Sequence, residues 1–127
     1  TTLFRSVSSL YTVAVDSNRM GLRLEGPSLQ AEGGADILSD AILEGSVQVS
    51  SGGAPIVMLA DHQTTGGYAK IAVATPTALQ MLAQLRPGQT LRFRWVTPLQ
   101  ALRAYKKQAA LCRPWMRGKE GYEYVDR

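Results

Sequence analysis

The stretch IVMLADHQTTGGYAKIAVA, residues 56–74, decides how the middle of the chain is expected to fold. It opens with a continuous apolar run at Ile56–Ala60, which is typical of a short buried strand. The polar, glycine-containing segment Asp61–Tyr68 follows and predicts a loop. Apolar and β-branched residues return at Lys70–Ala74, which predicts another strand. The stretch is therefore interpreted as two strands joined by a polar loop.

Further strands are predicted on both sides of this stretch. Tyr11–Val15 has the composition of a strand, and Met20–Leu24 alternates apolar and polar side chains as a half-buried strand does. Ile42–Val49 predicts a strand that is interrupted at Glu44-Gly45, where the glycine indicates a bulge. Downstream, Thr90–Val96 alternates three apolar side chains with two arginines, which predicts one buried and one exposed face.

Two helices are expected to begin in the same way, each with a capping threonine before a proline at the first helical position. Thr75-Pro76 opens a helix over about residues 76–84, and Thr97-Pro98 opens one over about 98–112 that ends before Pro114. The first helix is expected to turn three apolar side chains to the core: Leu79, Met81 and Leu82. About seven strands and two helices indicate a mainly β domain, either a barrel or a folded sheet.

Length and composition limit the class of protein. The chain has 127 residues, of which 45% are hydrophobic, so it has the size of one domain with its own core. Its apolar runs reach about five residues, far below the roughly 18 that a membrane span needs. No signal peptide is evident at the N-terminus, and Cys112 is the only cysteine, so we expect a cytoplasmic, reducing location.

Positive charge is concentrated at the C-terminal end. Residues 1–91 hold five bases and seven acids, a net charge of −2, whereas residues 92–127 hold nine bases and three acids, a net charge of +6. Such asymmetry is compatible with a nucleic-acid surface or with a solvated helix face and tail. We expect the solvated face, because the bases are not interleaved with stacking aromatic residues.

Several common sites are not expected. A zinc site needs three or four ligands, and this chain offers only His62 and Cys112 of the usual residue types, so no metal is predicted. The sequence contains no G-x-S-x-G turn, no Walker A loop and no G-x-G-x-x-G motif. Most standard enzyme signatures are therefore absent.

The loop after Ala60 nevertheless collects polar groups that can bind a ligand. Gln63 offers an amide, Thr64 and Thr65 offer hydroxyls, and Lys70 offers a cation, all within eight residues. Gly66-Gly67 is expected to permit positive φ and a close backbone approach. The segment is suited to a carboxylate, a carbonyl or a phosphate, although a polar hairpin connection explains the same residues.

This loop carries a resemblance to a known family. Asp61–Ala72 resembles the signature DRQTTGGYPKIA of the carboxyltransferase-type family, which includes the C subunit of 5-oxoprolinase, the Kip antagonists, allophanate hydrolase subunit 2 and part of urea carboxylase. His62 replaces an arginine of the signature, which removes a strong anion anchor, and Ala69 replaces a proline. Three other stretches agree with family motifs: Asn18–Pro27 with DRMGYRLEGP, Ile37–Val49 plus Pro55–Ala60 with SEGVAFGTIQVPPDGQPIVLLA, and Leu82–Phe93 with LAQLRPGDKVRF.

The resemblance implies a cyclophilin-like β-barrel and only part of a larger protein. These motifs belong to the C-terminal half of family members, so residues 1–112 are interpreted as that subdomain and 113–127 as a basic tail. The family's site is expected between the two halves. An N-terminal half and other subunits are therefore expected partners, whereas membranes and nucleic acid are not.

The implied function is a component of an ATP-dependent 5-oxoprolinase, which converts 5-oxo-L-proline to L-glutamate. The alternatives are a carboxyltransferase or allophanate-hydrolase type of component acting on urea or a related amide, for which biotin would be required, and a regulatory domain of the Kip antagonist type. We assign no individual catalytic residue. The loop residues expected to bind a small amide substrate are Gln63, Thr64, Thr65, Gly66, Gly67, Tyr68 and Lys70.

A second candidate group precedes the loop in the sequence. Arg19, Arg23 and Glu25 would share one face of a strand, so all three are expected to point the same way. They are interpreted either as a substrate-binding group or as an exposed face with a weak cross-strand ion pair.

Overall fold

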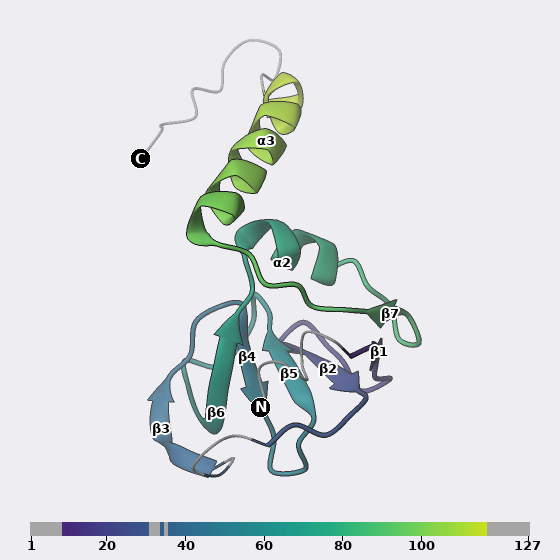
Figure 1. The fold of residues 1–127 in the computed structure, drawn as a ribbon, viewed down its shortest axis with the longest axis vertical. Helices are drawn as coiled ribbons and strands as arrows, with labels where there is room; N and C mark the ends of the chain where they lie inside the picture. The colour runs from purple at the N-terminus through teal and green to yellow at the C-terminus, as the bar shows by residue number, and fades with distance from the viewer. Residues whose placement is uncertain (1–8, 31–33, 35, 117–127) are drawn as a thin grey trace. The chain divides into compact units, whose positions relative to one another are not determined.

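The computed structural model describes residues 9–30, 34 and 36–116. The chain divides into two compact units, Thr1–Trp95 and Val96–Arg127. The first unit holds the sheet and a short helix, and the second holds a longer helix (Figure 1). The described strands are β1 (Tyr11–Val13), β2 (Gly21–Glu25), β3 (Asp36–Ala41), β4 (Ser46–Val49), β5 (Pro55–Met58), β6 (Thr65–Val73) and β7 (Thr90–Leu91), and the helices are α2 (Pro76–Leu82) and α3 (Pro98–Met116).

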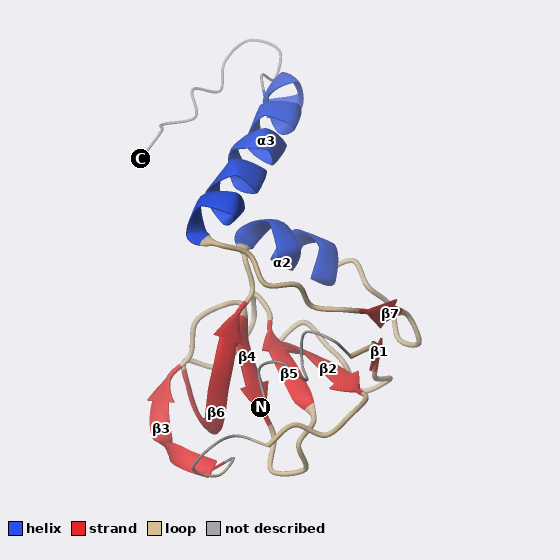
Figure 2. Cartoon of the chain, viewed as in Figure 1, coloured by secondary structure: helices blue, strands red, loops and turns tan. Residues whose placement is uncertain are grey.

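The seven strands form one sheet in the order β3-β6-β4-β5-β2-β1-β7 (Figure 2). All of its pairings are antiparallel. Val57 of β5 lies at the centre, since it is paired with Leu22 of β2 on one side and with Val47 of β4 on the other. The mainly β class with two helices, which the sequence predicts, is confirmed in the described part of the chain.

The core of the first unit is formed mainly by the central strands. Val57 and Tyr11 are fully buried, and the Tyr11 ring contacts Phe93 at a centroid distance of 5.9 Å. Helix α2 begins as expected, because the Thr75 hydroxyl accepts a hydrogen bond from the Ala78 N–H. The remaining buried members of the main cluster are Val13, Leu22, Leu24, Val47 and Leu82.

Of the three α2 side chains predicted to face the core, two do so. Leu82 is buried and Leu79 packs against the main cluster. Met81 is 64% exposed, so that prediction was wrong. Residues 79 and 82 are one helical turn apart and share a face, whereas residue 81 lies on a different face.

The prediction of one strand over Ile42–Val49 was also wrong. An unpredicted strand, β3, ends at Ala41, and β4 begins at Ser46. Gly45 lies in the turn between them with φ 85°, so its glycine serves a left-handed turn and not a bulge.

The crowding at Gly45 predicts that Gly45→Ala lowers stability more than Gly88→Ala does. A Cβ at Gly45 would lie 3.0 Å from the Ala74 carbonyl oxygen and 3.2 Å from Leu79 Cδ1, whereas a Cβ at Gly88, also at φ 85°, meets nothing within 4 Å. Gly88→Ala is expected to cost about 1 kcal/mol of unfolding free energy for its φ alone, and Gly45→Ala about 1–3 kcal/mol more. Urea denaturation checks this; equal losses would contradict the crowding at Gly45.

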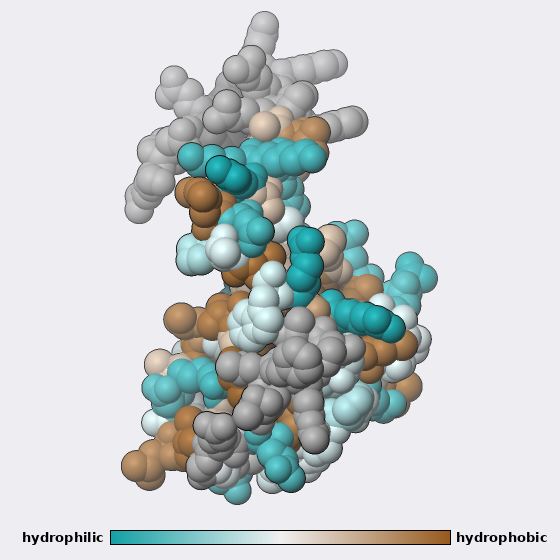
Figure 3. Space-filling model, viewed as in Figure 1, coloured by the Kyte–Doolittle hydropathy of each residue, from teal (hydrophilic) through white to brown (hydrophobic). Residues whose placement is uncertain are grey.

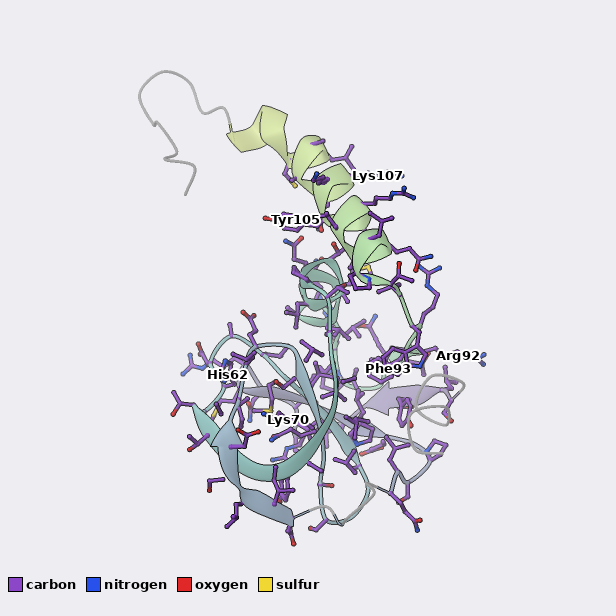
Figure 4. All side chains as sticks on the ribbon, turned by 60° about the vertical axis from the view of Figure 1, so that its left-hand side comes forward. His62, Lys70, Arg92, Phe93, Tyr105 and Lys107 are labelled. Atoms are coloured by element: carbon purple, nitrogen blue, oxygen red, sulfur yellow. The ribbon has the colours of Figure 1, made fainter. Side chains whose placement is uncertain are left out.

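Two predicted boundaries near the C-terminal end differ. Strand β7 contains only Thr90–Leu91, although Phe93 still faces the sheet and Arg92 points outward (Figure 4). Helix α3 continues through Pro114 to Met116. A proline removes one N–H donor, and the carbonyl that it leaves free, at exposed Ala110, is accessible to water.

Candidate functional site

The polar loop after β5 is shorter than predicted. Residues 59–64 form the connection, and Thr65 already begins β6. The connection is held by its backbone: the Leu59 N–H donates to the Met20 carbonyl at 3.1 Å, and the Asp61 N–H donates to the Arg19 carbonyl at 3.2 Å. The Thr64 carbonyl in turn accepts from the Ile42 N–H at 2.9 Å. The turn before β2 and the residue after β3 therefore meet at this loop.

The expected group of Arg19, Arg23 and Glu25 does not lie on one strand face. Arg19 precedes β2 in a turn closed by the Asn18–Gly21 bridge, and its Nε lies 2.9 Å from Asp61 Oδ2. Arg23 and Glu25 share the exposed face of β2, where Arg23 pairs with Asp16 at 3.4 Å. The structure thus brings Arg19 to the loop. Both ion pairs are exposed and contribute little to stability.

Thr64 and Thr65 present two exposed hydroxyls at the start of β6. Their backbones are fixed by the bond to Ile42 and by the pairing of Thr65 with Ala41 in β3. Neither hydroxyl makes a hydrogen bond to any residue in the described part of the chain. These hydroxyls are available as donors to a ligand on a backbone that does not need to move.

The two glycines that follow act through their small size. Gly66 and Gly67 lie in β6, and the glycines with positive φ are elsewhere, so the expected left-handed backbone was wrong. A Cβ on Gly66 would lie 2.6 Å from Ile42 Cδ1 and close to two amide nitrogens, at 3.1 Å from that of Gln63 and 3.3 Å from that of Gln48. Gly66 is required because three side chains occupy the space over it.

Gln48 is a buried neighbour of the candidate loop that the sequence analysis did not single out. Its side chain is 3% exposed, in a strand whose four residues are all buried. Its Nε2 donates to the Tyr68 carbonyl at 3.2 Å, and the β4–β6 register shifts between Val47 and Gln48. An amide between two valines in a predicted strand is the sequence signal that identifies such a residue, since a buried polar group needs a partner.

Lys70 is engaged within the protein. Its Nζ lies 2.5 Å from Asp40 Oδ2 and donates to the Ala41 carbonyl at 2.6 Å. The hydrogen bond from Lys70 to the Asp40 carboxylate, and a second one from the Ala41 N–H, hold the pKa of that carboxyl below its ordinary value. Lys70 therefore ties β6 to the end of β3, and an anionic ligand at this position would share the cation with Asp40.

The ion pair between Lys70 and Asp40 predicts that the stability of the protein depends on pH. Because the pKa of Asp40 is lowered on folding, its contribution is present above the pKa of the unfolded chain and is lost as the pH falls through the folded value. We expect the unfolding temperature of the wild type to fall more steeply below about pH 4 than that of Asp40→Asn. Thermal melts between pH 3 and 7 check this; parallel curves would contradict the role of the pair.

His62 and Tyr68 complete the predicted loop residues. His62 Nδ1 lies 2.7 Å from the Gln63 carbonyl oxygen, and its ring is on the loop while Lys70 is on β6 (Figure 4). The side chain of Tyr68 is 37% exposed. Among residues 9–30, 34 and 36–116, no three His, Cys, Asp or Glu side chains gather in a way that could hold a metal, and no helix is long and apolar enough to cross a membrane.

The arrangement offers neutral donors. Arg19 and Lys70 are paired with carboxylates, whereas Gln63, Thr64 and Thr65 are exposed and carry an amide and two hydroxyls. Fixed neutral donors stabilise a carbonyl oxygen on which negative charge develops. The geometry is therefore suited to an amide or lactam carbonyl.

Comparisons with known proteins identify relatives of this chain. Residues 2–95 match the family described as carboxyltransferase domain, subdomain A and B. The chain is 43% identical over 97 residues to the C subunit of 5-oxoprolinase from Haemophilus influenzae, covering 76% of this chain and 31% of that protein. It is 40% identical over 100 residues to the Escherichia coli protein of the same name, covering 79% and 32%.

A likeness to a solved structure agrees with the fold. The K. lactis urea amidolyase matches with a TM-score of 0.79 at 23% identity, over 97% of this chain and 8% of that one. At this identity the likeness supports the fold alone. The chain spans about a third of the length of the curated relatives that it matches.

Proposed function

Since the chain belongs to the family of the carboxyltransferase domain, subdomain A and B, we propose that it forms part of a 5-oxoprolinase. The observation that carries the proposal is the match to two proteins named as the C subunit of 5-oxoprolinase, at 43% and 40% identity over about three quarters of the chain. The reaction proposed is the opening of the lactam of 5-oxo-L-proline to L-glutamate. We further propose that this enzyme is bacterial and cytoplasmic.

The proposed partners are the polypeptide that corresponds to the unmatched part of the relatives, and the other subunits of the enzyme. The chain covers 31% and 32% of the two relatives, so about two thirds of each lies outside the match. The β3 edge of the sheet is exposed along its whole length, and Leu38 within it is 94% exposed. Apolar side chains protrude there at the lower left of Figure 3. An exposed edge strand from which apolar side chains protrude is the kind of surface that a further domain covers.

In this proposal the loop binds the lactam. Opening the ring places negative charge on the carbonyl oxygen, and Thr64 and Thr65 supply hydroxyl donors for it. Gln63 supplies an amide beside them, and Tyr68 packs on the substrate ring. Arg19 and Lys70 bind the substrate carboxylate only by sharing their bonds to Asp61 and Asp40. Arg23 and Glu25 are retained as weaker candidates, because they lie on β2 outside the loop.

ATP is proposed for the whole assembly, but the described residues do not form a phosphate cradle. The backbone of Gly66 and Gly67 is in the β6 ladder and not in an open, left-handed loop. The Lys70 ammonium is held by Asp40 and by the Ala41 carbonyl. We therefore place no step of nucleotide chemistry on these residues.

Reconstitution tests the proposal. The chain, joined to the remaining length of one of the two 5-oxoprolinase relatives and mixed with the other subunits, is expected to release ADP only when 5-oxoproline is present. Urea with a carboxylated biotin carrier runs in parallel for the carboxyltransferase alternative. A stable complex that turns over neither substrate would overturn the proposal and favour a regulatory domain.

Lys70→Met distinguishes a binding role from a structural one. If Lys70 shares its charge with the substrate carboxylate, this variant is expected to raise KM about 10- to 100-fold, which corresponds to the loss of one charge-assisted hydrogen bond. Asp40→Asn is the matched control, because it breaks the same ion pair but leaves the cation. An equal rise in KM in both variants would assign Lys70 a structural role only.

A further inference from the structure

His62 is held in the loop by its backbone and by its ring. The His62 N–H donates to the Leu59 carbonyl at 3.0 Å, and His62 Nδ1 lies 2.7 Å from the Gln63 carbonyl oxygen. A carbonyl oxygen only accepts hydrogen bonds, so Nδ1 carries the proton in this contact. In the neutral ring the second nitrogen, Nε2, then keeps its lone pair and is an acceptor. The two hydrogen bonds therefore fix an acceptor within the loop.

The Nε2 atom of His62 is accessible to a ligand. It makes no hydrogen bond to any residue in the described part of the chain. It is also not one of the fully buried polar atoms that lack a partner, so solvent reaches it from the half-buried ring. The carboxylates of Asp61 and Asp40 are acceptors too, but they are already paired with Arg19 and Lys70. A donor group of a ligand therefore finds an unoccupied acceptor at Nε2.

A small lactam matches this combination of groups. Its ring holds the amide in the cis form, so the N–H and the C=O lie on the same side of the molecule. His62 and Thr64 are two residues apart, so their Cα atoms are at most about 7.6 Å from each other. Side chains from both residues can therefore reach the two adjacent polar groups of one ring. The acceptor suits the N–H, and the hydroxyls of Thr64 and Thr65 suit the C=O.

We propose that His62 Nε2 accepts the hydrogen bond of the lactam N–H and makes the loop specific for a cyclic secondary amide. A cyclic ester has an oxygen in place of the N–H, so it would set a lone pair against Nε2 and leave the acceptor without a donor. Arginine, which the family signature has at this position, carries only donors and cannot read an N–H. The inference rests on the proposed function, and it assigns His62 to specificity and not to bond breaking.

Nitrogen NMR spectroscopy of the full chain with labelled histidine tests the protonation of the ring. The chain has a single histidine, so each ring nitrogen gives one signal that needs no further assignment to a residue. In the neutral ring we expect the proton on Nδ1 and a lone pair on Nε2. A neutral ring with its proton on Nε2 would overturn the proposal, because that nitrogen would then be a donor.

A pair of matched ligands tests the specificity in the reconstituted enzyme. The probes are 5-oxoproline and 5-oxotetrahydrofuran-2-carboxylate, the cyclic ester of the same shape, and equilibrium dialysis without ATP measures the dissociation constant of each. The wild type is expected to bind the lactam about tenfold more tightly than the ester. His62→Leu and His62→Arg are expected to lose most of this preference, whereas His62→Gln retains it, because its side-chain oxygen accepts a hydrogen bond. A ratio of two constants on one protein does not depend on how much of that protein is folded.

The outcomes separate this inference from the proposed function. A wild type that turns over 5-oxoproline but shows no preference for the lactam, or a preference that His62→Leu leaves unchanged, would overturn the role of His62 and leave the enzymatic proposal intact. A preference that persists in an assembly without turnover would support lactam recognition and contradict the enzymatic proposal. Binding of neither probe to the wild type would overturn both.

Discussion

Replacing both Thr64 and Thr65 with valine is expected to lower 5-oxoproline-dependent ADP release about 100- to 1,000-fold in the reconstituted enzyme. Valine has nearly the shape of threonine and suits the start of a strand, so β6 keeps its pairing with β3. Both side chains are exposed, and within the described residues their hydroxyls bond to nothing that the substitution would leave unpaired. The loss therefore reports contacts to the reacting substrate.

Steady-state kinetics separates the possible outcomes of this substitution. If the hydroxyls stabilise charge that develops on the lactam oxygen, kcat falls and KM changes little. Thr90→Val is the control, because Thr90 is exposed in β7 and belongs to no part of the loop. A double variant with unchanged kcat would remove the two threonines from the proposed chemistry, while turnover in the wild type would leave the enzymatic proposal intact.

Two of the strands that the sequence predicted show burial that is one-sided or complete. In β2, Leu22 and Leu24 alternate with exposed Arg23 and Glu25, and this period of two is visible without a structure. In β5 all four residues are buried, which matches a continuous apolar run. Both strands lie near the middle of the sheet, where the core determines the choice of residues.

Strand β3 could not be predicted in the same way. All six of its residues are exposed, so it has no alternation of buried and exposed side chains. Its register with β6 also shifts between Asp36 and Asp40. The segment forms a strand because it pairs with the edge of β6. This long-range pairing leaves no local pattern of buried and exposed residues in the sequence.

The sequence places most of the proposed loop residues in one segment but does not indicate their interaction partners. Thr64, Thr65 and Gln63 lie together because they are consecutive. The pairings of Lys70 with Asp40 and of Arg19 with Asp61 join segments 30 and 42 residues apart, so no sequence spacing indicates them. Those pairings change the interpretation of the site, because they turn two apparently free cations into paired ones.

Gln48→Leu is expected to lower kcat about 10- to 100-fold, because the Tyr68 carbonyl loses its donor and the β6 backbone beside Gly66 is no longer held in place. The unpaired carbonyl should also cost about 1–3 kcal/mol of unfolding free energy. Gln84→Leu is the control: its Nε2 also donates to a backbone carbonyl, that of Gln80, but at the exposed end of α2. Kinetics and urea denaturation of both variants provide the comparison.

Gln48→Glu distinguishes positioning of the site from loss of stability. A buried carboxyl has a raised pKa, and only its protonated form can donate to the Tyr68 carbonyl as the amide does. The ratio of variant to wild-type kcat is therefore expected to rise as the pH is lowered from about 8 to about 6. A ratio that does not change with pH, in a variant as stable as the wild type, would show that the donor to Tyr68 does not position the loop. A rising ratio would show that Gln48 acts through the backbone of β6, because its own side chain is buried away from solvent and donates to the Tyr68 carbonyl.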